Sequence, residues 1–293
     1  MNDNSKQETG RPLGGNDLPD QTARRDVAMW HATVAYDGTA FRGWQIQPNL
    51  RTVQGELQKR LRLLLGQPEL RLTATSRTDT GVHALDQHIN FAAPCSPDLS
   101  PESVRRTLNR WLPKDVQVRD MGFAQPDFSA RYDSVGKAYT YVVYNGEKCH
   151  PLFSRFVWPM RRELSVPDMQ EAAAHLVGEH DFSSFAVNPK REIATNVRRL
   201  FRVEVSARNG FVFFNVVGAS FLYKMVRSIV GHLVYVGRGA ARPDDIIGVL
   251  NARDRSAAAA SVPGVGLFLA KVFFEKDEWQ TYEPQLPPFG WQD

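Results

Sequence analysis

Apolar residues recur at helical spacing in several segments of the chain. Residues 52–66 carry one such stripe, with Thr52 placed to cap the helix at its N-terminus and Gly66 at its C-terminus. A second helix is predicted after Ser100, with Pro101 at its first position. The same spacing predicts further helices at residues 166–178, 219–237 and 242–254.

Runs rich in β-branched and aromatic residues lie between these segments and predict strands. Residues 198–218 are typical of a hairpin, because Asn209-Gly210 divides them as a two-residue turn. Further strands are predicted at residues 29–38, 70–75, 86–92, 115–124, 137–146 and 264–275. This order predicts an α+β protein of two halves, each with a mostly antiparallel sheet backed by helices.

The two ends of the chain differ in composition from the rest. Residues 1–28 are polar and rich in glycine and proline, which predicts a disordered tail, and they lack the apolar stretch of a signal peptide. Residues 280–293 are Pro-rich and predict a second tail. Between the tails, we expect the halves to occupy residues 29–134 and 135–279.

The composition narrows the class of protein. Apolar residues make up 42% of the 293, which is enough for a sizeable core. Neither Cys95 nor Cys149 belongs to a C-x-x-C pair, so the sequence argues against a disulfide framework and a zinc knuckle. No run approaches the roughly 20 apolar residues of a membrane span. We therefore expect a cytoplasmic protein that has no membrane partner.

The charge is only mildly basic, with a formal net charge of +4 and a pI of about 9.1. Its distribution is more informative, because basic residues recur in adjacent pairs. Such pairs suit phosphate contacts, and they serve equally well as solubilising charge on exposed faces. The pairs are Arg105/Arg106, Arg161/Arg162, Lys190/Arg191 and Arg198/Arg199.

The stretch "TATSRTDTGVHALDQHINFA" (residues 73–92) concentrates the candidate chemistry between two predicted strands. Gly81 permits a turn with positive φ that would direct Asp79 outward. Arg77 lies two residues before Asp79, and in an extended segment its guanidinium could hydrogen-bond the carboxylate and orient it. Such a carboxylate is a nucleophile or a general base. The alternative is a turn-capping aspartate with a surface ion pair.

Other kinds of site fit this stretch less well. Asp79 and His83 are four residues apart, a spacing that would place two metal ligands together only on a helix, and Gly81 argues against a helix. His83 is therefore expected to be packed or hydrogen-bonded near the loop, and His88 is not expected to bind a metal. Serine-nucleophile motifs and Gly-rich phosphate loops are absent from the sequence.

Several motifs together resemble one family. "SRTDTGVHALDQ" resembles the signature of the tRNA pseudouridine synthase A family, and "YDGTAFRGWQIQPNLRTVQGEL" is similar to that family's opening motif. Ser76 and Thr80 depart from the glycine and alanine that are usual there, and both replacements are small. Further matches follow in the family's order: "FSARYDSVGKAYTYVVYN", "LVGEHDFSSF", "FLYKMVRSIVGHLVYVGRG" and "GVGLFLAKV". Together they span roughly residues 30–275.

This resemblance implies a fold and an activity. The fold would be the pseudouridine synthase fold, in which two RRM-like halves join their mostly antiparallel sheets around a central cleft. The enzyme would isomerise uridine to pseudouridine at positions 38, 39 and 40 of the tRNA anticodon stem-loop, without a cofactor or a metal. The implied partners are tRNA, held at the anticodon stem-loop and the elbow, and a second copy of the chain in a homodimer.

The resemblance also implies roles for single residues. Asp79 takes the position of the essential aspartate, and Arg77 would pair with it and help hold open the space left by the flipped nucleotide. Tyr139 would stack on the extruded uracil or handle a proton. Arg227 would be a second ion-pair partner of Asp79 or a phosphate contact. The remaining implied contacts are Leu267 and Leu269 in the uracil pocket, and Arg42 and Gln45 on the RNA.

Simpler explanations exist for several of these residues. Tyr139 could pack within a strand, Arg227 could lie on the polar face of its helix, and Leu267 and Leu269 could belong to the core. Two other functions also remain open. A non-catalytic binder of structured RNA would use the same fold, and a glycosidic hydrolase would need a second carboxylate, for which Asp86 is the only nearby candidate.

Overall fold

The computed structural model describes residues 27–95, 99–187 and 195–284. The predicted N-terminal tail therefore lies almost entirely outside the described residues, as does the end of the C-terminal one. The strands are β1 Val27–Tyr36, β2 Thr73–Ala74, β3 His83–Pro94, β4 Val116–Ala124, β5 Gly136–Asn145, β6 Trp158–Met160, β7 Gly178–Asp181, β8 Val197–Arg208, β9 Phe211–Gly218 and β10 Leu267–Phe273. The helices are α1 Val53–Leu65, α2 Pro101–Trp111, α3 Val166–Ala174, α4 Met225–Gly237 and α5 Asp245–Ala252.

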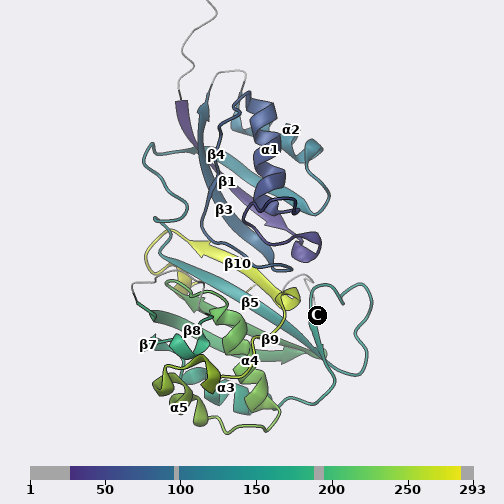
Figure 1. Ribbon diagram of the computed structural model, residues 1–293, viewed down its shortest axis with the longest axis vertical. Helices are drawn as coiled ribbons and strands as arrows, with labels where there is room; N and C mark the ends of the chain where they lie inside the picture. The colour runs from purple at the N-terminus through teal and green to yellow at the C-terminus, as the bar shows by residue number, and fades with distance from the viewer. Residues whose placement is uncertain (1–26, 96–98, 188–194, 285–293) are drawn as a thin grey trace, which may run out of the picture.

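These strands form one continuous sheet that runs through the long axis of the molecule (Figure 1). Its order is β4-β1-β3-β10-β5-β9-β8-β7, with β2 added on β3 and β6 on β5. Neighbours along this path pair antiparallel except β10 and β3. The sheet is therefore mostly antiparallel, as predicted.

Local signals account for several elements. The Thr52 side chain accepts a hydrogen bond from the Gly55 backbone N–H (3.3 Å), and Gly66 is left-handed at φ 63°, so both predicted caps of α1 are confirmed. In the β8–β9 hairpin, Asn209 and Gly210 both have positive φ, at 52° and 79°. A two-residue turn of this kind matches the twist of the strands that it joins.

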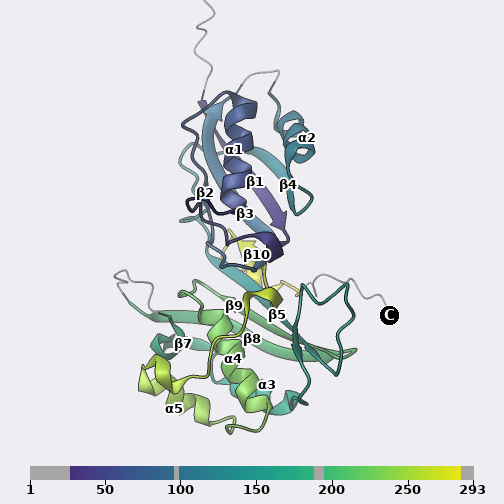
Figure 2. The same cartoon turned by 45° about the vertical axis from the view of Figure 1, so that its right-hand side comes forward.

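The last strand joins the two halves. β10 pairs with β3 of the N-terminal half on one side and with β5 of the C-terminal half on the other, although it is the final strand of the described residues. Helices α1 and α2 cover the N-terminal part of the sheet, and α3 and α4 cover the C-terminal part (Figure 2). One cluster of buried apolar residues extends through both parts. The halves are therefore held by shared strands and by a shared core.

Some predicted elements have other bounds in the structure. The helix expected at 219–237 begins only at Met225, because Lys224 has left-handed geometry at φ 59°. The helix expected to reach residue 178 ends at Ala174, and Gly178 starts β7 instead. Within the predicted C-terminal tail, Tyr282 packs edge-to-face on Phe273, with 5.5 Å between the ring centroids. Among the helices of the described ranges, none has the length and apolar character needed to cross a membrane.

Candidate active site

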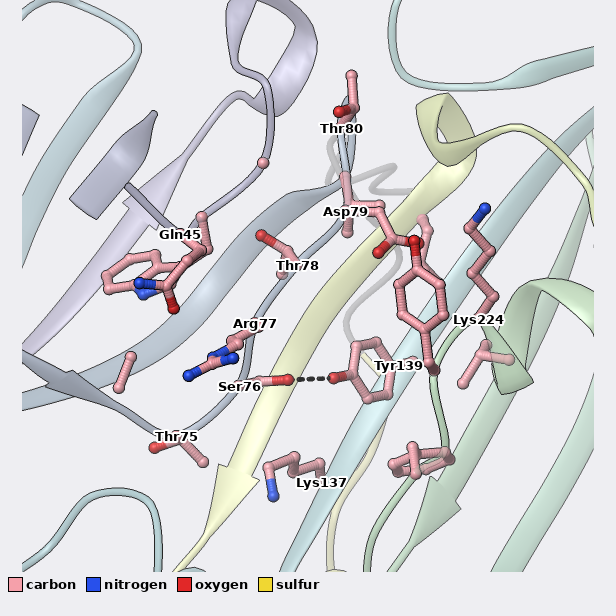
Figure 3. A pocket seen from close by; sticks show the side chains of 18 of the residues that line it. Gln45, Thr75, Ser76, Arg77, Thr78, Asp79, Thr80, Lys137, Tyr139 and Lys224 are labelled. Atoms are coloured by element: carbon pink, nitrogen blue, oxygen red, sulfur yellow. Dashed lines mark hydrogen bonds between the residues drawn. The ribbon is translucent and has the colours of Figure 1, made fainter. Parts of the chain in front are cut away.

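A cleft of about 1090 Å³ lies between the two halves, and residues from both line it. The N-terminal half contributes the loop between β2 and β3, which carries Asp79, and the loop that follows β1. The C-terminal half contributes β5, the segment from Ser220 to Arg227, and the first residue of β10. Segments far apart in the sequence therefore face one space (Figure 3).

Close backbone contacts hold the Asp79 loop on two sides. The Val82 N–H donates to the Asp79 carbonyl (3.1 Å), which closes a turn in which Gly81 has φ 77°. A Cβ added at Gly43 would lie 2.8 Å from the Thr78 carbonyl oxygen, and one added at Gly264 would lie 2.5 Å from that of Thr80. Only glycine allows such an approach, so both neighbouring loops can press directly on the loop that carries the carboxylate.

Side-chain hydrogen bonds fix the beginning of the same loop. The buried Gln87 side chain accepts from the Ser76 N–H (3.2 Å) and donates to the Ser76 carbonyl (2.7 Å). The Thr78 hydroxyl lies 2.8 Å from the Tyr36 hydroxyl, and both residues are buried. The loop therefore has little freedom to move away from the cleft, although no strand is assigned between Ala74 and His83.

The Asp79 carboxylate is held from the opposite half of the molecule. Nη1 of Arg227 donates to Oδ2 of Asp79 at 2.7 Å, and Nε of the same guanidinium donates to the Val262 carbonyl at 2.7 Å. The side chains of Asp79 and Arg227 are only 19% and 14% exposed. Within the described residues, Oδ1 of Asp79 accepts no hydrogen bond. One carboxylate oxygen is thus oriented while the other is available to a substrate.

Arg77 does not form the ion pair that was predicted for it. Arg77 is exposed, and its side chain points away from Asp79 (Figure 3). The prediction assumed an extended segment in which residues two apart face the same way, but the chain is a loop at this point. The expected second partner, Arg227, is the one that pairs with Asp79. Arg77 still lines the cleft.

Tyr139 links the two halves within the cleft. Its hydroxyl lies 2.8 Å from Oγ of Ser76 (Figure 3). Its ring packs edge-to-face on Phe221, with 5.0 Å between the ring centroids. Burial is the main cause that raises the pKa of Tyr139 to about 12; the hydrogen bond to Ser76 opposes the rise, and the negative charge of Asp79 contributes to it. The hydroxyl is therefore protonated at neutral pH.

The other predicted contact residues divide into two groups. Leu267, Arg42 and Gln45 line the cleft, the first buried at its wall and the other two exposed. Leu269 does not line it, which corrects the prediction. It pairs with Tyr139 across the sheet and is fully buried in the core, so neighbouring side chains cover it completely.

His83 has a structural position rather than a metal-binding one. Nδ1 accepts a hydrogen bond from the Gly38 N–H (3.0 Å), and Nε2 lies 3.0 Å from the Val265 carbonyl. The ring is buried and stacks on Phe268, with centroids 4.7 Å apart. Within the described ranges, no group of three His, Cys, Asp or Glu side chains could hold a metal ion. His83 therefore joins the loop after β1 to the loop before β10.

Asp86 cannot serve as a second carboxylate opposite Asp79. It follows Leu85 and precedes Gln87 on β3, so it faces away from the side of the sheet on which Gln87 holds the loop. Its carboxylate accepts from the Val272 N–H (2.9 Å) and is not among the groups that line the cleft. Without Asp86 in the cleft, Asp79 lacks the second carboxylate that glycosidic hydrolysis needs.

Sequence reasoning missed several residues of the cleft, three of which lie beside or near Tyr139. Ser76 was noted only as a departure from the family pattern, yet it bonds Tyr139. Phe221 was assigned to a helix, but it lies before α4 and contacts Tyr139. Lys137 lies two residues before Tyr139 on β5 and therefore points to the same side of the sheet, a signal that the strand pattern alone could have supplied.

The cleft is strongly basic. Asp79 is its only acidic lining residue among those described, and the basic ones outnumber it. By contrast, Arg105 and Arg106 on α2 both pair with Glu102, and the pair Lys190/Arg191 lies outside the described residues. The six basic lining residues are Arg42, Arg77, Arg131, Lys137, Lys224 and Arg227.

Comparison with known proteins agrees with this geometry. The family model described as tRNA pseudouridine synthase matches residues 32–133 and 172–275. "tRNA pseudouridine synthase A" of Geobacillus kaustophilus is 41% identical over 83% of this chain and 93% of that protein. The protein of the same name from Bacillus subtilis is 39% identical over 83% of this chain and 98% of its own length.

The chain belongs to the tRNA pseudouridine synthase family. Membership confirms the predicted fold class and makes the chain an isomerase that acts on tRNA. The matched segments of this family contain Asp79, Arg227 and Leu267, whereas Tyr139 falls between them. A solved structure, "Crystal structure of the archaeal box H/ACA sRNP Nop10-Cbf5 complex", matches 84% of this chain and 50% of that one, at 12% identity and a TM-score of 0.35. That likeness is too weak to bear on the fold.

Proposed function

We propose that this protein converts uridine to pseudouridine at positions 38, 39 and 40 of the tRNA anticodon stem-loop, with Asp79 as the essential carboxylate. The observation that carries the proposal is the position of Asp79. It lies in a basic cleft between the halves, with one oxygen held by Arg227 and the other uncommitted. A surface turn with an incidental ion pair would have no such surroundings.

The substrate has to leave its helix to reach this carboxylate. A protein carboxylate cannot reach the glycosidic bond of a uridine that is stacked in a stem. The nucleotide must therefore flip out of the stem, which costs a few kcal/mol. The basic lining of the cleft attracts the phosphates of the stem and offsets that cost. The cleft, at about 1090 Å³, is large enough to receive a nucleotide together with part of its strand.

Within the cleft, Asp79 of the N-terminal half and Arg227 of the C-terminal half are assigned different roles. Asp79 faces the reacting nucleotide while the N1–C1′ bond breaks, the base rotates, and C5 joins C1′; C5 then loses its proton to solvent and N1 takes up a proton. Arg227 keeps the carboxylate in place because its own guanidinium is fixed to the Val262 carbonyl. Orientation of this kind limits the reorganisation needed at the moment of reaction.

Tyr139 and Leu267 are proposed to hold the uracil. An aromatic ring against a base contributes about 1–3 kcal/mol, and such contacts tolerate a rotating base because they have no fixed polar partner. Tyr139 is well placed, since the raised pKa of its hydroxyl keeps the side chain neutral beside Asp79. Leu267 supplies apolar surface at the first position of β10.

The protein is further proposed to act as a homodimer in the cytoplasm, where its tRNA substrate is found. The anticodon stem and the elbow of a tRNA lie too far apart for one small domain to hold both. A second copy would extend the basic surface toward the elbow. Light scattering of the purified protein tests this part, because a monomeric mass would contradict it.

The decisive experiment maps pseudouridine position by position in tRNA treated with the purified protein. Pseudouridine at positions 38, 39 or 40 is expected with the wild type, and none with Asp79→Asn. Tritium release from tRNA labelled at C5 of uridine gives the rate. An Asp79→Asn protein that releases tritium at a near-normal rate would contradict the assigned role, and a wild type that binds tRNA without any release would favour a non-catalytic RNA binder.

A further inference from the structure

Lys137 occupies an unusual position in the cleft. It lies on β5 two residues before Tyr139, so the two side chains share one side of the strand. Figure 3 shows Lys137 on the opposite side of Tyr139 from Asp79. The side chain is half-buried and lines the cleft. The amine is therefore part of the substrate space but is separate from the reacting carboxylate.

Within the described residues, no carboxylate forms an ion pair with this amine. Its recorded hydrogen bond goes to the hydroxyl of Ser134, at 3.3 Å. Its cross-strand neighbours, Val272 on β10 and Gly218 on β9, carry no charge. The nearby charged group that acts on it is the cation of Arg131, which also lines the cleft. Two cations thus face the same space without an anion between them.

Such an arrangement is unfavourable in the free protein. Burial, together with the smaller effect of the Arg131 charge, lowers the pKa of Lys137 to about 8. An anion placed between the two side chains would oppose both effects, because it would pair with each cation. A bound anion would therefore stabilise the protonated form of Lys137 beside Arg131.

We propose that Lys137 and Arg131 form a subsite for one backbone phosphate of the RNA, next to the flipped uridine. This inference rests on the proposed function, since it requires the uracil to lie near Tyr139. Side chains two residues apart on a strand are separated by about 6.6 Å along it. A ribose separates a base from its own phosphate by a similar distance. A nucleotide whose base contacts Tyr139 would thus place a phosphate at Lys137.

The position of Lys137 distinguishes this role from a catalytic one. A lysine that removed the C5 proton would have to lie on the Asp79 side of the base, whereas Lys137 lies beyond Tyr139 (Figure 3). Arg131 is exposed and sits in the loop before β5, where it can adjust to a phosphate that enters from solvent. The subsite would therefore combine Lys137, which is held on a strand, with Arg131, whose exposed side chain can change conformation.

Binding experiments in the Asp79→Asn background test the subsite without turnover. The dissociation constant of an anticodon stem-loop RNA is measured against salt for Lys137→Gln, Arg131→Gln and Lys114→Gln. Lys114 is an exposed control outside the cleft, and its replacement removes the same charge. Lys137→Gln and Arg131→Gln should each weaken binding about tenfold and reduce the salt slope by roughly 0.7–1. Lys114→Gln should do neither.

The pH dependence provides an independent test. Only the protonated amine of Lys137 pairs with phosphate, so affinity should be highest below pH 8 and should fall as the pH rises above the pKa of about 8 of the free protein. Lys137→Arg keeps its charge and should bind equally well from pH 7 to pH 9. Because every variant binds the same RNA, titration of the RNA itself would appear in all of them.

The result that would overturn the subsite is a Lys137→Gln protein whose affinity and salt slope equal those of Lys114→Gln. Arg131→Gln alters an exposed residue and keeps the test valid if Lys137→Gln does not fold. Such a result would not contradict the proposed catalytic role of Asp79, because pseudouridine mapping of the wild type tests that role separately. Conversely, an active Asp79→Asn enzyme would refute the proposed catalytic role whatever the phosphate result.

Discussion

Replacing Arg227 with glutamine tests the central ion pair most directly. The change removes a 2.7 Å contact to Asp79 and a 2.7 Å hydrogen bond to the Val262 carbonyl. Truncating one partner of a fully buried pair destabilises a protein by about 3–5 kcal/mol. Asp79 retains 19% exposure, so water can solvate the remaining carboxylate in part. We therefore expect a loss of about 2 kcal/mol in the free energy of unfolding.

Activity should fall further than stability suggests. Without Arg227 the carboxylate is free to rotate, and loss of one orienting or stabilising group in an active site typically lowers kcat by about 10²–10³. Arg227→Lys keeps the charge but lacks the planar guanidinium whose Nε and Nη1 reach the two partners, so its rate should be intermediate. The assays are urea unfolding for stability and tritium release for kcat and KM.

A double-mutant cycle provides the refuting result for the pair. The free energies of unfolding of Asp79→Asn, Arg227→Gln and the double variant should reveal a coupling of about 1–2 kcal/mol. Additive effects, within about 0.3 kcal/mol, would show that the two side chains do not stabilise each other. A tritium-release rate for Arg227→Gln within twofold of the wild type would equally contradict the positioning role.

Three further predictions concern the cleft walls. Tyr139→Phe should keep turnover within about tenfold, whereas Tyr139→Leu should raise KM or abolish tritium release, because it loses base stacking of about 1–3 kcal/mol. Gly264→Ala should lower kcat more than tenfold, since its Cβ would lie 2.5 Å from the Thr80 carbonyl and displace the Asp79 loop, and an unchanged rate would contradict that contact. Leu269→Ala should reduce the free energy of unfolding by about 2–5 kcal/mol and leave KM unchanged, because Leu269 is buried in the core. Leu267→Ala should chiefly raise KM, because Leu267 lines the cleft. The reverse pattern would contradict these positions.

Several features could be predicted from the sequence because their causes are local. The caps at Thr52 and Gly66 depend on residues within one turn of the helix that they end. The hairpin at Asn209-Gly210 depends on two residues that tolerate positive φ. The position of Asp79 in a glycine-containing turn is equally local, and the motif around it was enough to indicate the family. In each case the decisive contacts join residues close together in the chain.

Other features required the tertiary structure because their causes are distant in sequence. The partner of Asp79 is Arg227, which lies 148 residues away in the sequence. Arg77, only two residues from Asp79, was also predicted to pair with it and does not. Asp86 was a candidate second carboxylate until the sheet placed it on the face away from the cleft. Leu269 matched the pattern of a pocket residue, and only its burial beside Tyr139 removed it.

The sequence by itself determined which residues can form helices, strands and turns, and its motif singled out Asp79 as the candidate carboxylate. The tertiary structure decided which side chains meet. It did so by inserting the last strand, β10, between β3 and β5, which brings the Asp79 loop against α4 and β5 and makes one cleft from two halves. Local preference cannot specify that insertion, because the free energy that favours it comes from burying apolar surface shared by segments far apart in the chain.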